Sequence, residues 1–132
     1  IIYSNQSFVD SHPTAAADFV RATLKGLADA VADPATAAQI AVDKINASGN
    51  PFYLSPEGET ARWAVEADLI GGAADADAPL GVPLADLLTA EVTTYAAIGL
   101  FGGQAPDVAP FFADLAAAVY DGGVLIWPAT SG

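Results

Sequence analysis

Three prolines, each preceded by a residue suited to cap or end a helix, divide this chain into helical segments. The pairs are His12-Pro13, Asp33-Pro34 and Ser55-Pro56. Proline is well accommodated at the first position of a helix, because the N–H that it lacks would have no partner within the helix. It also disfavours helical backbone at the preceding residue. The chain is therefore predicted to start helices at residues 13, 34 and 56.

Apolar residues recur at three- and four-residue steps in these segments, the pattern of an amphipathic helix with one buried face. The second helix is expected to end at Gly49, and the third to run through Ile70 and stop at Gly71-Gly72. Gly26 lies inside the first helix, where we expect close approach of another element to offset its cost. The expected inward positions are Phe19, Val20, Leu24, Leu27 and Val31 in the first helix and Ala38, Ile40, Ala41 and Ile45 in the second.

The rest of the chain is predicted to hold shorter elements. Phe8 and Val9 fit a single helical turn. That turn should end before Pro13, because proline restricts the residue that precedes it. A further helix should begin at Pro83 or Leu84 and end at Gly99, with Leu84, Leu88, Val92, Tyr95 and Ile98 on its buried side. After it, a helix over residues 108–119 should close at Gly122-Gly123. Residues 124–128 suit an edge strand or a docking tail.

Together these elements predict a mainly α fold of four to five helices with one to three short strands. A lone strand at residues 1–4 would leave its ladder hydrogen bonds unpaired unless a sheet exists elsewhere in the protein. The chain contains no methionine, and its first residues read as the interior of a longer polypeptide. We therefore expect helices that cover a β-sheet which these 132 residues do not supply.

The charge of the chain argues against two classes of partner. Sixteen acidic residues stand against four basic ones, which gives a net charge of −12. Such a surface repels phosphate backbones and anionic headgroups, so neither nucleic-acid binding nor membrane-surface binding is expected. Apolar runs are far shorter than the ~18 residues of a membrane span. We expect a soluble protein that does not insert into a membrane.

The residues available for chemistry do not indicate an enzyme. Cysteine is absent, which removes disulfides, thiolate zinc sites and thiol nucleophiles. His12 is the only histidine, and before Pro13 it reads as a surface cap. No Ser-His-Asp set or metal-ligand spacing is readable. We expect no catalytic residues, no metal and no cofactor.

One charged group stands out in the helix that starts at Pro56. Glu59, Arg62, Trp63 and Glu66 share one helical face, which sets a guanidinium beside two carboxylates and an indole. In one interpretation they form a ligand-binding cleft wall, where Trp63 stacks on a planar or cationic ligand and the charges fix it. In the other, the charges form an intrahelical salt bridge and Trp63 packs on a neighbouring lobe. Both interpretations stay open.

Two stretches resemble a known family of binding proteins. The first comprises residues 1–5, Phe8-Val9, His12-Pro13, residues 19–26 and residues 32–35. The second comprises residues 54–59, Arg62, Trp63 and Glu66, then Gly81-Val82-Pro83 and the spaced set Ala90, Glu91, Tyr95 and Gly99. Together they resemble NMT1/THI5-like solute-binding proteins of the nitrate, sulfonate, taurine and thiamine-pyrimidine type. His12 stands where the family often has asparagine.

The resemblance implies a role and an architecture. It implies the C-terminal part of an α/β two-lobed fold of the periplasmic-binding-protein type II, delivering a small solute to an ABC permease. Residues 1–132 would then form one segment, with a crossover strand at 1–4, a helical lobe portion at 5–128 and a tail at 129–132. The N-terminal part of the same protein would be its partner, in the periplasm or at the cell surface, with or without a lipid anchor.

The same resemblance places Asn5 after the crossover strand, at the ligand cleft. A plain helix cap is the equal alternative for Asn5. The solute expected is a small nitrogen- or sulfur-containing organic compound, such as a sulfonate or a thiamine-type pyrimidine. The alternative function is a non-catalytic helical domain that binds another protein.

Overall fold

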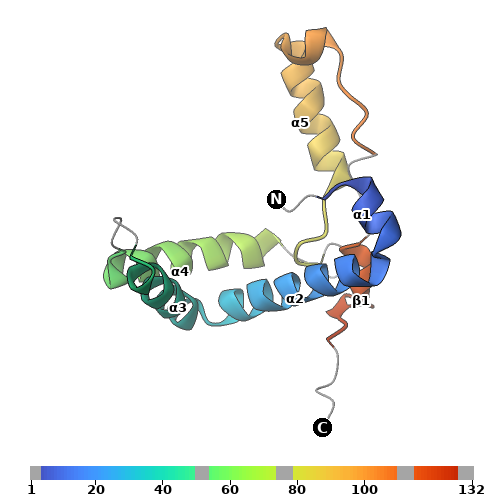
Figure 1. Ribbon diagram of the computed structural model, residues 1–132. Helices are drawn as coiled ribbons and strands as arrows, with labels where there is room; N and C mark the ends of the chain where they lie inside the picture. The colour runs from blue at the N-terminus through green and yellow to red at the C-terminus, as the bar shows by residue number, and fades with distance from the viewer. Residues whose placement is uncertain (1–3, 50–53, 74–78, 110–114, 128–132) are drawn as a thin grey trace.

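The computed structural model describes residues 4–49, 54–73, 79–109 and 115–127, and this part of the chain is mainly α, as predicted. The expected strand at residues 1–4 falls almost wholly outside these ranges. The α-helices are α1 (Gln6–Ser11), α2 (Pro13–Ala32), α3 (Pro34–Ala47), α4 (Pro56–Ala73) and α5 (Ala85–Ala97). The 3-10 turns η1 (Leu100–Gly103) and η3 (Ala117–Val119) and the strands β1 (Tyr120–Asp121) and β2 (Val124–Leu125) follow (Figure 1).

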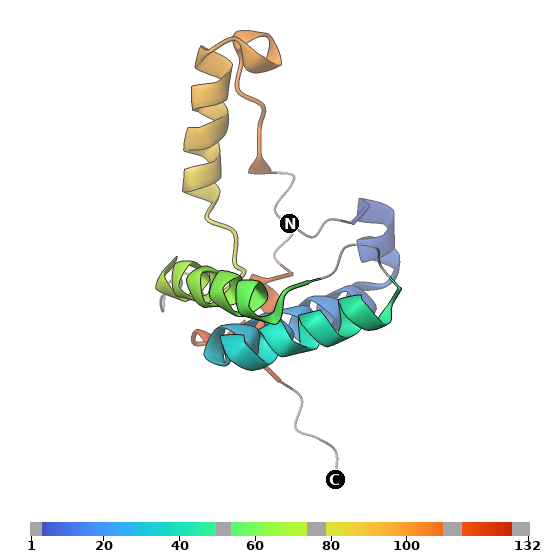
Figure 2. The same ribbon diagram turned by 90° about the vertical axis from the view of Figure 1, so that its left-hand side faces the viewer.

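The predicted helix starts at Pro13, Pro34 and Pro56 are confirmed. Between α2 and α3 a single residue, Asp33, leaves the helical conformation, with φ −137° and ψ 77°. Its N–H donates to the Asp29 carbonyl at 2.9 Å, and its side chain accepts from the Thr36 N–H at 3.1 Å. One aspartate thus closes one helix and caps the next. This break turns α3 across the end of α2, and α4 runs back beside α2 (Figures 1 and 2).

Two expectations about glycine are wrong: where α4 ends, and which glycine lies at a close contact between helices. Gly71 and Gly72 lie inside α4 rather than ending it. A Cβ built on Gly71 would meet Val31 Cγ1 at 3.3 Å, so Gly71 is where α2 and α4 approach closely. Around Gly26, in contrast, no described residue outside the local helix backbone places an atom within 4 Å of such a Cβ. The glycine at a close contact between two helices is therefore Gly71 and not Gly26.

The C-terminal part of the described chain is a hairpin rather than the end of a helix. Of the expected 108–119 helix, Val108 lies outside any helix, Ala109 and residues 117–119 are in 3-10 conformation, and residues 110–114 lie outside the described ranges. Gly122 and Gly123 have φ of 53° and 80° and join β1 to β2, whose pairs are Tyr120 with Leu125 and Asp121 with Val124. Two consecutive positive φ angles define the hairpin turn that glycine favours. The expected strand at residues 124–128 is confirmed for Val124–Leu125.

The hairpin and the 3-10 turn before it pack against α2. Val119 is fully buried, and the Tyr120 hydroxyl donates to the Leu80 carbonyl at 2.6 Å. The next residue, Gly81, has φ +80° and faces Leu24 of α2 so closely that a Cβ there would lie 2.1 Å from Leu24 Cδ2. This small core therefore joins α2, the turn at residues 79–82 and the hairpin.

Much of the remaining apolar surface is uncovered. Phe19 and Ile40, which were predicted to face inward, are exposed, as are Leu84, Tyr95 and Ile98 of the expected buried face of the helix ending at Gly99. The helix itself ends at Gly99 as predicted, with φ +97°. Helix α5 stands away from the layer of α2, α3 and α4 in both views (Figures 1 and 2). The described helices thus do not close around a centre of their own.

Candidate functional site

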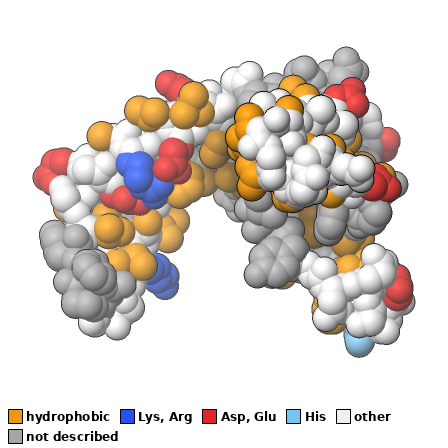
Figure 3. Space-filling view, turned by 90° about the horizontal axis from the view of Figure 1, so that it is seen from above, with side chains coloured by type: hydrophobic (Ala, Val, Ile, Leu, Met, Phe, Trp, Pro, Cys, Tyr) orange, Lys and Arg blue, Asp and Glu red, His pale blue; other side chains and the backbone are white. Residues whose placement is uncertain are grey.

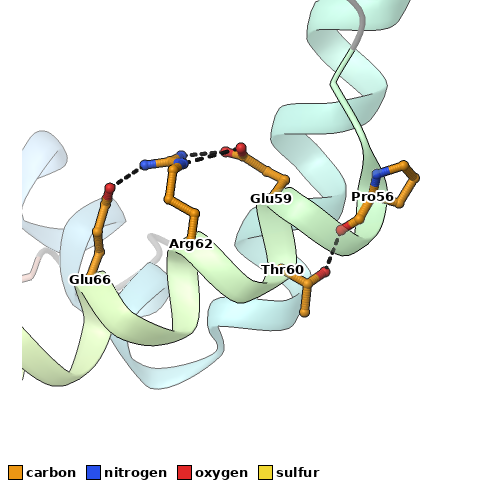
Figure 4. Close-up of polar contacts among 5 residues, drawn as sticks. All are labelled: Pro56, Glu59, Thr60, Arg62 and Glu66. Carbon is orange, nitrogen blue, oxygen red and sulfur yellow. Dashed lines mark hydrogen bonds and ion pairs between the residues drawn. The ribbon is translucent and has the colours of Figure 1, made fainter.

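The four α4 residues singled out from the sequence come together through Arg62. Its guanidinium donates to both carboxylate oxygens of Glu59, from Nε to Oε2 at 3.1 Å and from Nη2 to Oε1. Its Nη1 donates to Oε1 of Glu66 at 2.5 Å (Figure 4). Because the three residues lie one helical turn apart, the helix itself sets this geometry. Arg62 is therefore clamped between two carboxylates along α4.

Burial distinguishes the two carboxylates. Glu59 is only 8% exposed, where α4 packs on α3, whereas the side chains of Arg62 and Glu66 are 47% and 41% exposed. The hydrogen bonds and charge of Arg62 outweigh this burial and hold the pKa of Glu59 below its usual value, with a small contribution from the nearby Trp63 side chain. In return, Glu59 and Glu66 raise the pKa of Arg62. Glu59 and Arg62 therefore stay ionised at neutral pH.

Trp63 offers a ring face on which a planar ligand could stack, but Arg62 lies over that ring. Arg62 Cζ lies 5.2 Å from the centroid of the Trp63 ring, within cation–π range. The ring is half-buried, and its buried Nε1 has no hydrogen-bond partner among the described residues. Arg62 thus engages the indole and both carboxylates at once. The arrangement fits the interpretation as an intrahelical salt bridge. A ligand would have to displace Arg62 to stack on this face of the Trp63 ring.

The start of α4 is held by Ser55, the cap expected from the sequence, and by Asn46 and Thr60, which sequence reasoning did not single out. Asn46 of α3 donates to the Leu54 carbonyl at 3.3 Å and accepts from the Leu54 N–H at 3.1 Å. Ser55 accepts from the Gly58 N–H at 3.2 Å, and Thr60 donates to the Pro56 carbonyl at 2.8 Å (Figure 4). Asn46 has no local sequence signal, because its partner is eight residues away. Together these bonds fix where the first turn of α4, and with it Glu59, lies on α3.

Asn5 is not brought to this group. Its side-chain oxygen accepts from the Phe8 N–H at 2.8 Å and from the Ser7 hydroxyl at 2.9 Å, so Asn5 caps α1. Helix α1 lies at the N-terminal end of α2, whereas the first turns of α4 lie at the other end, beside α3 (Figure 1). The Asn5 side chain is already used as the helix cap that was its alternative role.

His12 is the exposed N-cap residue of α2, as expected, but its side chain makes no capping hydrogen bond. It ends α1 and precedes α2 through its backbone, whose N–H donates to the Phe8 carbonyl at 2.8 Å. The imidazole instead stacks on the Phe8 ring, with centroids 5.1 Å apart and planes 19° from parallel. The stack is an i,i+4 contact across the last turn of α1.

A metal site and a membrane-spanning helix are two further possibilities for the described ranges. Groups of three or more His, Asp or Glu side chains placed to hold a metal ion are not found there. None of the helices in the same ranges combines the length and the apolar character that crossing a bilayer requires.

Comparison with known proteins gives one match. Residues 1–37 match the family model described as NMT1/THI5 like, and in the structure they span α1, α2 and the first turn of α3. This is the first of the two stretches that carry the family resemblance in the sequence. Neither the curated proteins nor the solved structures contain a match to this chain.

Proposed function

We propose that this chain is part of the solute-binding subunit of an ABC importer and binds a small organic solute by closure of two lobes. The observation that carries the proposal is the match of residues 1–37 to the NMT1/THI5 like family. Members of that family are chiefly binding proteins rather than enzymes, so the chain is assigned binding without turnover. Its working partners would be an ABC permease and the remaining N-terminal part of the protein, outside the cytoplasm.

The uncovered apolar surface supports the part of the proposal that concerns the second lobe. Large apolar side chains are exposed on α2, α3, α4, α5 and the hairpin. Exposed apolar area on this scale is unusual for a protein that works alone and marks surfaces that another element covers. A two-lobed α/β protein supplies such a cover in its sheet. The helical segment at residues 5–128 would then form one side of one lobe, and residues 1–4 the crossover strand.

The solute proposed is a sulfonate or a thiamine-type pyrimidine, held in part by the α4 group. Binding would first displace the Arg62 guanidinium from the Trp63 ring and from the two carboxylates. Trp63 would then supply a stacking face, Arg62 a bidentate donor for an acidic oxygen, and Glu59 and Glu66 the acceptors for an amino group. Asn5 would contribute from the crossover end once the lobes close. Closure would shift the balance between open and closed states by the difference in the solute's affinity for them.

Native mass spectrometry and calorimetric titration test this proposal on the polypeptide expressed with the coding sequence that adjoins it in frame. The probes are taurine, methanesulfonate, nitrate and 4-amino-5-hydroxymethyl-2-methylpyrimidine. One of them should bind saturably and raise the unfolding free energy by about 2.7 kcal/mol at a hundredfold excess over its Kd. Trp63→Ala should weaken that binding, while Trp127→Ala serves as the matched control. Absence of binding by all four probes and of any co-purified solute would contradict solute transport.

A second candidate function is a helical domain that binds another protein without any solute. The exposed apolar residues of α5 and η1 favour it, because a projecting helix with an apolar face is a common protein-binding element. Cooperative unfolding of the 132-residue chain alone, as a monodisperse monomer, would favour this reading over the first.

A further inference from the structure

The part of the molecule that most needs a partner is the α5 arm, which we define as residues 84–103. It consists of Leu84, α5 and η1, and it projects away from the other helices (Figures 1 and 2). Residues 104–109 run back beside it in both views. Ala96 is buried, and Leu88 and Val92 are half-buried. One side of the arm is thus covered within the chain.

The other side of the arm is apolar and uncovered. Leu87 and Ile98 are 65% and 72% exposed, and Leu84, Tyr95, Leu100 and Phe101 are also exposed. The helical period puts Leu84, Leu87, Tyr95 and Ile98 on one face. An uncovered face of this kind is typical of a permanent contact, because a freely exposed one promotes aggregation. The face therefore calls for a constant partner rather than a passing one.

The tip of the arm has a second feature of a docking element. Phe101 has φ +55°, in the left-handed region, between Gly99 and Gly102 with φ of +97° and +67°. For a non-glycine residue this conformation is sterically unfavourable, because Cβ comes too close to the following carbonyl oxygen. Strained residues of this kind persist where they serve a contact. Here the strain holds an exposed phenylalanine side chain at the end of the arm, and aromatic residues are enriched in the cores of interfaces.

Charge decides the chemistry of the partner. Glu91 lies on the same face as Leu87 and Tyr95, and it accepts a hydrogen bond from the Tyr95 hydroxyl at 2.8 Å. This bond and the charge of Glu91 raise the pKa of Tyr95. Covering the face would bury a carboxylate, and a buried carboxylate needs a cationic partner. The chain has none nearby in sequence, because its four basic residues are Arg21, Lys25, Lys44 and Arg62.

A second copy of this chain does not meet that need. Residues 63–132 contain nine acidic residues and no basic one, and the whole chain carries a net charge of −12. Seen from above, the arm side of the molecule shows apolar and acidic side chains, and the visible Lys and Arg lie at the other end, over α3 and α4 (Figure 3). Three of the four basic residues are already paired with acids of their own helix. Two copies would therefore repel each other at this face.

We propose that the α5 arm docks on a protein surface that is apolar at its centre and presents Lys or Arg to Glu91, supplied by the remaining lobe of the solute-binding protein. The identity of that lobe rests on the proposed function. Leu87, Ile98 and Phe101 fill the apolar part, and Glu91 sets the register through its ion pair. The arm thereby holds the two parts of the protein together away from the α4 group.

Site-specific photo-cross-linking tests the arm in the polypeptide expressed with its adjoining in-frame coding sequence. Benzoylphenylalanine is placed at Leu87, or at Thr93 on the opposite face of α5 as the matched control. The Leu87 position should cross-link to a peptide of the same polypeptide outside residues 1–132 that contains Lys or Arg. Glu91→Lys should lower that yield about tenfold by reversing the charge pair, while Glu91→Gln should lower it less. Circular dichroism checks that each variant folds.

Three outcomes would overturn the inference: cross-links from Leu87 to residues 1–132 of a second copy, equal yields from Leu87 and Thr93, or a yield that Glu91→Lys leaves unchanged. The outcome is separable from that of the solute titration. A Leu87 cross-link without any bound solute would retain the arm contact and reject transport. A bound solute without the cross-link would retain transport and reject the arm.

Discussion

At the scale of single residues, two glycines show how differently the same residue type acts. Gly81 has a positive φ and lies against Leu24, whereas Gly26 lies in α2 with open space where a side chain would be. In the sequence they look alike, because both interrupt or follow helical patterns. Only their surroundings in the folded chain tell a required glycine from a replaceable one.

Gly81→Ala is predicted to destabilise the chain strongly. The added methyl would lie 2.1 Å from Leu24 Cδ2 in a backbone with φ +80°, and the strain and overlap should cost about 2–4 kcal/mol in unfolding free energy. Gly26→Ala is the control and should stabilise the helix by about 0.5–1 kcal/mol. Urea unfolding followed by circular dichroism measures both. Equal effects of the two substitutions would show that Leu24 does not pack on Gly81.

The ion pairs of Arg62 predict a pH dependence. Because Arg62 keeps the pKa of Glu59 below its usual value, the stabilisation is present above the ordinary glutamate pKa and is lost as pH falls through the lowered one. The unfolding free energy should therefore decrease on acidification below about pH 4.5. Arg62→Gln should destabilise the chain at pH 7, since Glu59 is then buried without a cation, and should flatten this dependence. A pH profile of Arg62→Gln identical to that of the parent chain would contradict the assignment.

At the scale of secondary-structure elements, turns rather than helices determine the path of the chain. The break at Asp33 and the hairpin turn at Gly122-Gly123 each involve one or two residues in an unusual conformation. The Asp33-Pro34 signal was readable because proline and aspartate act locally. The sequence predicts a helix end at Gly122-Gly123, but the structure has a hairpin turn there. Glycine suits a helix end and a hairpin turn equally, and the pairing of β1 with β2 decides between them.

The hairpin turn should discriminate between side chains that tolerate positive φ and those that do not. Gly122→Val is predicted to cost about 1–2 kcal/mol or more, while Gly122→Asn should cost much less, because asparagine adopts the left-handed conformation readily. Thermal unfolding followed by circular dichroism, with tryptophan fluorescence as a second probe, measures both variants. If valine and asparagine proved equally tolerated, the turn at residues 122 and 123 would not have the geometry described.

At the scale of the whole molecule, charge opposes compactness. With a net charge of −12, exposed carboxylates repel one another in the folded chain, and salt screens that repulsion. The midpoint of urea unfolding should therefore rise between 0.05 and ~0.5 M sodium chloride, most steeply at the low end, where the screening length falls fastest. Sucrose at equal osmolality is the control for general exclusion effects. A midpoint independent of salt would show that the acidic residues are already balanced locally.

The sequence by itself determined the helix starts at Pro13, Pro34 and Pro56, the mainly α content, the cap formed by Asp33 and the ion pairs of Arg62 with Glu59 and Glu66. Each depends on residues within four positions of one another, so local sterics and hydrogen bonding suffice. The tertiary structure alone decided which apolar faces are covered. Leu24 is buried because Gly81 and the hairpin pack on it, whereas Phe19 and Ile98 belong to equally apolar stripes and stay exposed. Burial depends on the arrival of distant elements, which periodicity along one helix does not encode.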